Sequence, residues 1–281
     1  MKSIEKPKES AESTFVKCIS LVKNRDLKSR LLACKHLIIS AEIEFETKII
    51  EGNIHTVLKE ETVNTNVTAK ELEKVYTYRM AAKGKPGRGI YDKLMAAPVL
   101  GICPLCSHRL VETLDHYLPK SDFPRLVVTP INLIPSCFPC NKLKSDISAS
   151  IPEEESLHPY FDNIESEIWL SAKVNKTTPP SLTFYVEYNK NCSALLNERI
   201  QNHFELLLLN KLYSTQAAVK LANLYFRLDS LYKSSGKLGV QKYLKDESDS
   251  RFSNNKNSWQ TAFFIALHND AWFCDGGFKM E

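Results

Sequence analysis

The chain has 281 residues, of which 43% are hydrophobic and 25% are charged, and its formal net charge is +4 at pH 7. This composition is typical of globular proteins and argues against a largely disordered chain, and only 9 glycines argue against glycine-rich architectures. No apolar run approaches the roughly 18 residues that span a bilayer, and the polar start lacks the apolar core of a signal peptide. We therefore expect a soluble, cytoplasmic protein without a membrane partner. The oligomeric state does not follow from the composition.

Apolar residues recur at helical spacing through most of the first hundred residues. The pattern predicts two or three helices over residues 14–59 and further helices over residues 69–83 and 90–97. Residues 84–89 are rich in glycine and proline, which predicts a loop between the last two. We expect residues 1–98 to form a helical N-terminal region.

Two Cys-x-x-Cys pairs mark the next segment. Cys103 and Cys106 form the first pair, and Cys137 and Cys140 form the second. Each pair supplies two soft donors, and four thiolates suit a tetrahedral Zn²⁺ ion, so we predict a structural zinc site. The alternatives are four unligated thiols or a redox pair, whereas a disulfide framework is not expected in a chain without a secretory signal.

The residues between the two pairs carry further candidate chemistry. Asp115 and His116 follow an alternating stretch over residues 110–114, which predicts a strand. A second extended stretch is predicted over residues 126–129, just before Asn132. Asn141 directly follows the last cysteine, where we expect a helix to open. The predicted order is therefore strand, strand, helix, with a carboxylate–histidine pair on the first strand and an amide on the helix.

The remainder of the chain predicts a connector, a hairpin and more helices. Residues 152–167 contain six acidic residues and no Lys or Arg, which predicts a solvated acidic connector. Residues 168–174 and 182–188 predict a hairpin, and helical periodicity returns beyond residue 195. We expect a zinc module over residues 99–150 and a mainly helical region over residues 151–281. The predicted class is α+β, predominantly α, with the small module embedded between helical parts.

Three segments resemble the HNH endonucleases, which have the ββα-metal fold, with a flanking zinc ribbon. They are LDHYLPKS at residues 114–121, NLIPSC at residues 132–137 and CNKLK at residues 140–144. A weaker likeness at residues 86–92 and 272–278 is to stand-alone bacterial HNH proteins. Some of these belong to anti-phage defence systems, such as the HNH partner of Septu-type ATPases. The resemblance implies metal-dependent hydrolysis of DNA phosphodiester bonds.

The resemblance also implies a role for each site residue. His116 is the expected general base, and Asp115 and Asn141 are the expected ligands of a catalytic Mg²⁺ or Mn²⁺ ion. Asn141 stands where the family often has histidine, and its amide oxygen is a donor that hard cations accept. Asn132 is expected to hold the loop between the strands and so to fix the aim of the histidine. The implied products carry a 5′-phosphate and a 3′-hydroxyl.

Three lysines lie near the predicted cleft. Lys120, Lys142 and Lys144 are candidate phosphate contacts, with Lys144 favoured, and the alternative is that they are solvated surface residues. The leading prediction is a DNA endonuclease that acts as an effector of anti-phage defence. One alternative is a zinc-stabilised nucleic-acid-binding module without catalysis. Another is a nuclease subunit that is silent until an ATPase or sensor protein activates it.

Overall fold

The computed structural model describes residues 1–60, 62–64 and 66–279. The chain divides into two compact units, Met1–Asn163 and Ile164–Glu281. Helices predominate, and the strands of the described residues form three two-stranded antiparallel sheets. The predicted class, α+β and predominantly α, is confirmed. The predicted regions 1–98 and 99–150 share the first unit, because the second unit begins only at Ile164.

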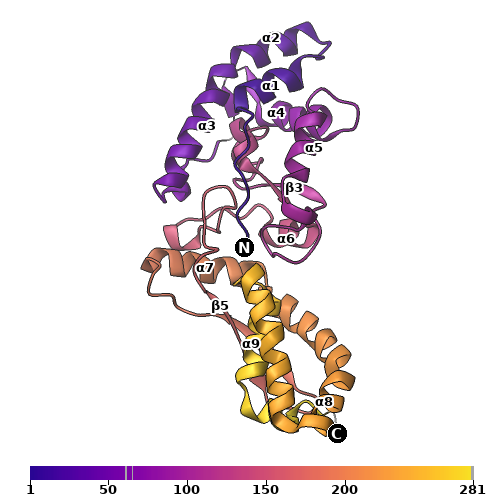
Figure 1. Cartoon of the computed structure of the whole chain (residues 1–281). Helices are drawn as coiled ribbons and strands as arrows, with labels where there is room; N and C mark the ends of the chain where they lie inside the picture. The colour runs from indigo at the N-terminus through magenta and orange to yellow at the C-terminus, as the bar shows by residue number, and fades with distance from the viewer. Residues whose placement is uncertain (61, 65, 280–281) are drawn as a thin grey trace. The chain divides into compact units, whose positions relative to one another are not determined.

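The first unit contains six α-helices among its described residues, and all the helices predicted before residue 98 are present (Figure 1). The α-helices are α1 (Ala11–Ile19), α2 (Arg25–Ala33), α3 (Lys35–Ile50), α4 (Ala69–Val75), α5 (Arg88–Ala96) and α6 (Phe138–Lys144). The strands are β1 (Thr62–Asn64), β2 (Val67–Thr68), β3 (Thr113–His116) and β4 (Leu133–Ser136). A π-helical turn, Tyr76–Ala81, extends α4.

Side-chain caps fix where several of these helices begin. Ser10 accepts a hydrogen bond from the Ser13 amide at the start of α1, and Asn24 accepts one from the Leu27 amide at the start of α2. Thr68 and Glu71 form a reciprocal capping box at the start of α4. Each cap satisfies an amide that has no partner within the helix, so these polar residues set the helix boundaries.

The core of the first unit joins the helices to the β3–β4 hairpin. Phe15, Leu72 and Met80 come from the helical part, and Leu114 and Leu133 come from the two strands. All belong to one cluster of buried residues. The hairpin with the candidate site residues therefore rests on the same core as the N-terminal helices.

The two strands of the candidate module lie further along the chain than the sequence pattern predicts. β3 begins at Thr113, not residue 110, and pairs with β4 so that Asp115 faces Ile134 and His116 faces Leu133. The prediction of a strand over residues 126–129 is wrong. The segment begins in the 3-10 turn Pro124–Leu126. Local backbone hydrogen bonds, such as the one from the Thr129 amide to the Leu126 carbonyl, take the place of hydrogen bonds between strands.

The acidic segment after the module is more than a solvated connector. Glu155 is 1% exposed, and its Oε1 accepts hydrogen bonds from the backbone amide and the Nδ1 of His55. Tyr160 donates its hydroxyl proton to the Leu133 carbonyl at 2.9 Å. The part of the segment that contains Glu155 and Tyr160 therefore packs within the first unit. Charge patterning alone does not reveal a carboxylate with a buried partner.

The second unit consists of a hairpin and helices, as predicted. Its elements are β5 (Leu170–Asn175), β6 (Ser181–Val186), α7 (Ala194–Leu206), α8 (Leu209–Asn254) and α9 (Trp259–Asn269). α8 is interrupted at Gly236, whose φ of 60° is one that glycine adopts without steric cost. Its two halves lie side by side, since the Arg227 guanidinium lies over the Tyr243 ring (Figure 1). Within the described residues, no helix is both long and apolar enough to traverse a bilayer.

Candidate active site and metal centre

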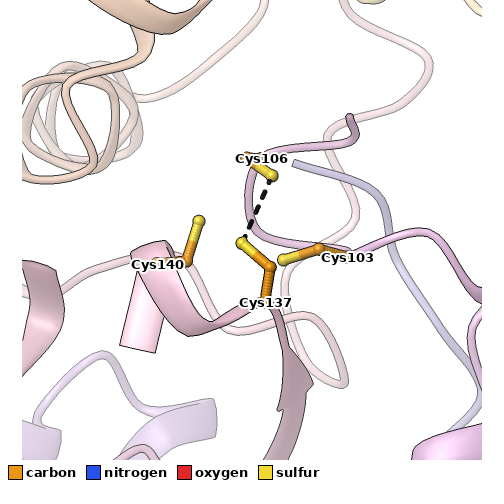
Figure 2. A group of neighbouring side chains, drawn as sticks. All are labelled: Cys103, Cys106, Cys137 and Cys140. Carbon is orange, nitrogen blue, oxygen red and sulfur yellow. Dashed lines mark hydrogen bonds between the residues drawn. The ribbon is translucent and has the colours of Figure 1, made fainter. Parts of the chain in front are cut away.

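The two cysteine pairs meet in the first unit. Cys103 and Cys106 lie in a tight loop, where the Cys103 amide donates to the Arg109 carbonyl at 2.7 Å. Cys137 follows β4, and Cys140 lies in α6 (Figure 2). The four Sγ atoms all lie within 4.8 Å of one another, and all four residues are fully buried. The prediction that the two pairs come together is confirmed.

The spacing of the thiols suits a tetrahedral metal site. A Zn–S bond of about 2.3 Å places two sulfurs of a tetrahedron about 3.8 Å apart. The Sγ atoms of Cys106 and Cys137 are 3.9 Å apart, and Figure 2 shows these sulfurs facing one another. Hydrogen bonding from the Cys103 thiol lowers the pKa of Cys106. Four buried cysteines arranged in this way could hold a zinc ion.

A pocket of about 320 Å³ is lined by residues of β3 and α6, and none of the four cysteines lines it. Five of the residues singled out in the sequence line it, and they come from β3, the following loop and α6. These five are Asp115, His116, Lys120, Asn141 and Lys142. The strand–strand–helix order places them together, because β3 delivers the first two residues and α6 crosses beside that strand.

His116 is held with one ring nitrogen engaged and the other available as an acceptor. Its Nε2–H donates to the Val127 carbonyl at 2.9 Å, and the Tyr76 ring packs edge-on at 4.5 Å between centroids. A neutral imidazole that donates from Nε2 keeps a lone pair on Nδ1. Burial lowers the pKa of His116 to about 3, so the ring is neutral at pH 7. His116 is therefore in the protonation state of a proton acceptor.

Asp115 presents a buried carboxylate next to a lysine. The residue is 4% exposed, and its Oδ2 lies 3.5 Å from Lys144 Nζ without making a hydrogen bond. Burial raises the pKa of Asp115 to about 6, because desolvation disfavours the charged form more than Lys144 favours it. The carboxylate oxygen can thus accept another cation, and a divalent ion would stabilise its charged form.

Asn132 does not line the pocket but shapes the loop beside it. The residue is fully buried, and its Oδ1 accepts from the Leu118 amide at 2.8 Å. Its Nδ2 donates to the carbonyls of Leu118 and Leu126 at 3.1 and 3.2 Å. These bonds join the end of β3 to the turn that carries Val127, the hydrogen-bond partner of His116. The geometry matches the loop-holding role expected for Asn132.

Lys144 requires a correction. The sequence favoured it as a phosphate contact, but it is 4% exposed and does not line the pocket. Its Nζ donates to the His116 carbonyl at 2.8 Å, so the side chain joins α6 to β3. Lys144 lies about one helical turn after Asn141, on the face of α6 that β3 covers. Lys120 and Lys142 do line the pocket, and Lys142 is exposed.

Sequence reasoning did not single out Tyr76 or Asp146, which also line the pocket. Tyr76 comes from the distant π-helical turn, and no local signal connects it to the histidine. Asp146 lies just beyond the end of α6 and also lines the pocket. Its nearness to Asn141 along the chain was a signal, because an acid five residues after a candidate ligand is within reach of the same site.

Comparison with known proteins gives one distant relative. No family model matches the chain, and no solved structure matches it. Protein ea31 of Escherichia phage lambda is 33% identical over 172 residues, which cover 60% of this chain and 58% of the relative. The match thus spans less than two thirds of that protein's length, and its name states no activity.

Proposed function

We propose that the protein is a metal-dependent endonuclease of the HNH type that hydrolyses DNA phosphodiester bonds. The observation that carries the proposal is the pocket that brings Asp115, His116 and Asn141 together on a strand–strand–helix module. A module that only binds nucleic acid has no need of a neutral imidazole fixed through Nε2 beside a buried carboxylate. Supporting evidence is the placement of Lys120 and Lys142 on the same pocket, where they can contact phosphates.

His116 acts as the general base in this proposal. Its Nδ1 accepts the proton of the attacking water, while the Val127 carbonyl holds the ring in position through Nε2. The low pKa keeps Nδ1 free of a proton at neutral pH, and the phosphate that Lys120 and Lys142 contact favours the protonated ring after transfer. The base is thus ready before catalysis and stabilised during it.

Asp115 and Asn141 would hold Mg²⁺ or Mn²⁺. The donor set fits, because both residues offer oxygen and the Oδ2 atom of Asp115 is buried without a hydrogen bond. When bound, such an ion polarises the phosphate and stabilises the leaving oxygen. The thiol cluster has a different role. We assign it a structural Zn²⁺ ion, which ties the loop of Cys103 to the junction between β4 and α6.

Plasmid cleavage by purified protein tests the proposal. Wild-type protein should nick or linearise DNA when Mg²⁺ or Mn²⁺ is added to metal-free buffer, and His116→Ala should lose at least about a hundredfold in rate. His36→Ala is the matched control, because that histidine is exposed and lies in the same unit. Metal dependence is tested by omitting Mg²⁺, since a strong chelator would also extract zinc. Ligase should reseal the nicks directly if the ends are 5′-phosphate and 3′-hydroxyl.

Three results distinguish the endonuclease from the alternative functions. Equal cleavage by wild type and His116→Ala would reject the assigned base. DNA binding without cleavage at any metal concentration would favour the zinc-stabilised binding module. Cleavage that appears only with an ATPase or sensor protein would identify a subunit that requires activation. A role in anti-phage defence stays a prediction, and protection of cells against phage by wild type but not by His116→Ala would support it.

A further inference from the structure

Asp146 brings a second carboxylate to the pocket that contains Asp115. Both residues line the same 320 Å³ pocket, together with Asn141. Asp115 is buried and Asp146 is exposed. The arrangement offers three oxygen donors from β3, α6 and the residue two positions beyond α6.

The backbone after α6 directs Asp146 toward the pocket. The helix ends at Lys144, and Ser145 adopts φ 48° and ψ −142°, a conformation that costs energy for a residue other than glycine. The Ser145 amide donates to the Asn141 carbonyl at 2.8 Å, and the Ile147 amide donates to the Lys144 carbonyl at 3.2 Å. These bonds hold the turn that reverses the chain at the pocket, where Ser145 is also a lining residue.

The buried oxygen of Asp115 is an independent sign that a ligand belongs in this pocket. Oδ2 has no hydrogen-bond partner, and the nearest cation, Lys144 Nζ, is 3.5 Å away and donates instead to the His116 carbonyl. A buried polar atom left without a donor costs free energy. A Mg²⁺ or Mn²⁺ ion binds carboxylate oxygens at roughly 2.0–2.2 Å and so satisfies this oxygen far better than Lys144 does.

We propose that Asp146 is a third protein ligand of the divalent cation, alongside Asp115 and Asn141. The inference rests on the proposed function, because it concerns the same site. Two carboxylates carry two negative charges, which balance a divalent ion, whereas Asp115 and Asn141 alone carry one. Three protein oxygens leave about three positions of an octahedral ion for water and phosphate, which is typical of Mg²⁺ sites at phosphate substrates. Lys120 and Lys142 remain available for the phosphate.

The test measures Mn²⁺ binding by electron paramagnetic resonance on the full chain, purified with zinc so that the thiols are already loaded. The variants are Asp146→Asn and Asp115→Asn. The control is Glu153→Gln, which removes the same charge from an exposed residue of the same unit that does not line the pocket. Asp146→Asn should weaken Mn²⁺ binding about tenfold or more, Asp115→Asn should do the same, and Glu153→Gln should bind Mn²⁺ as wild type does.

The possible results separate this inference from the proposed function. If Asp115→Asn weakens Mn²⁺ binding and Asp146→Asn does not, Asp146 is a solvated acid and the inference is overturned while the proposed site stands. If neither variant weakens binding, the cation site itself is misplaced and both proposals fall. A wild-type chain that binds Mn²⁺ through Asp146 but cleaves no DNA would support the inference and contradict the nuclease.

Discussion

Replacing Asn132 with alanine should open the loop beside the candidate site. The side chain makes three hydrogen bonds to the backbone of Leu118 and Leu126 and is fully buried. Alanine leaves one amide and two carbonyls without these partners. The substitution also frees the turn that carries Val127, so it should release the His116 ring from its hydrogen-bond partner.

The magnitude follows from those three bonds. A buried hydrogen bond contributes about 1 kcal/mol net, so their loss should cost about 3 kcal/mol in local stability. Asn24 offers a matched comparison, because its side chain makes one cap bond, to the Leu27 amide at the start of α2. Asn24→Ala should cost about 1 kcal/mol. The buried asparagine should therefore matter about three times as much as the exposed one.

Hydrogen exchange followed by mass spectrometry measures both effects in the full chain. Peptides that cover β3 and β4 should exchange about a hundredfold faster in Asn132→Ala, since each 1.4 kcal/mol is a factor of ten. Peptides from α2 should exchange about fivefold faster in Asn24→Ala, and peptides from the second unit serve as an internal reference. Exchange in β3 and β4 that differs less than fivefold between Asn132→Ala and wild type would refute the assigned hydrogen-bond network.

Three further predictions concern the same unit. The guanidinium of Arg30 bonds to Glu71 and lowers its pKa to about 2, so the stabilising effect of this carboxylate is complete above pH ~4.5 and is lost as the pH falls toward 2. A pH-independent difference in unfolding free energy between wild type and Glu71→Gln would contradict this. Gly87→Ala should destabilise the protein by about 1–3 kcal/mol in thermal unfolding, because the added Cβ would lie 2.5 Å from the buried Sγ of Cys18. Gly89→Ala, which adds a Cβ in open space on α5, should stabilise the protein slightly. Cys137→Ser should reduce zinc content below one ion per chain by elemental analysis, and Cys192→Ser, outside the cluster, should keep it.

The sequence was sufficient wherever the signal was local. Helical periodicity located the helices before residue 98, because burial of one face imposes a repeat that short windows reveal, and two strand-like stretches located the hairpin of the second unit. The Cys-x-x-Cys spacing predicted the thiol cluster, since two cysteines three residues apart form one half of a tetrahedral site in a tight turn. The sequence also predicted that Asp115 and His116 lie close together, because they are consecutive residues of one strand.

The position of the second strand and the burial of Lys144 depended on tertiary structure. Residues 126–129 have the apolar character of a strand, but Pro124 begins a 3-10 turn there and the strand starts at Leu133. The sequence predicts an accessible Lys144, yet the residue is buried because it lies on the face of α6 that packs against β3. Strand pairing and burial are set by residues distant along the chain, which a local pattern does not contain.

The sequence by itself therefore determined the parts of the candidate site, and the tertiary structure decided how they are combined. Tyr76 lies forty residues before His116 and packs against its ring, and Asp146, which follows α6, lines the same pocket as Asp115. The contact between Tyr76 and His116 does not follow from spacing, since it arises where separate segments cover a shared pocket. The physical reason is that chemistry belongs to residue types, whereas the protonation state and partners of each residue depend on its burial and on the elements folded against it.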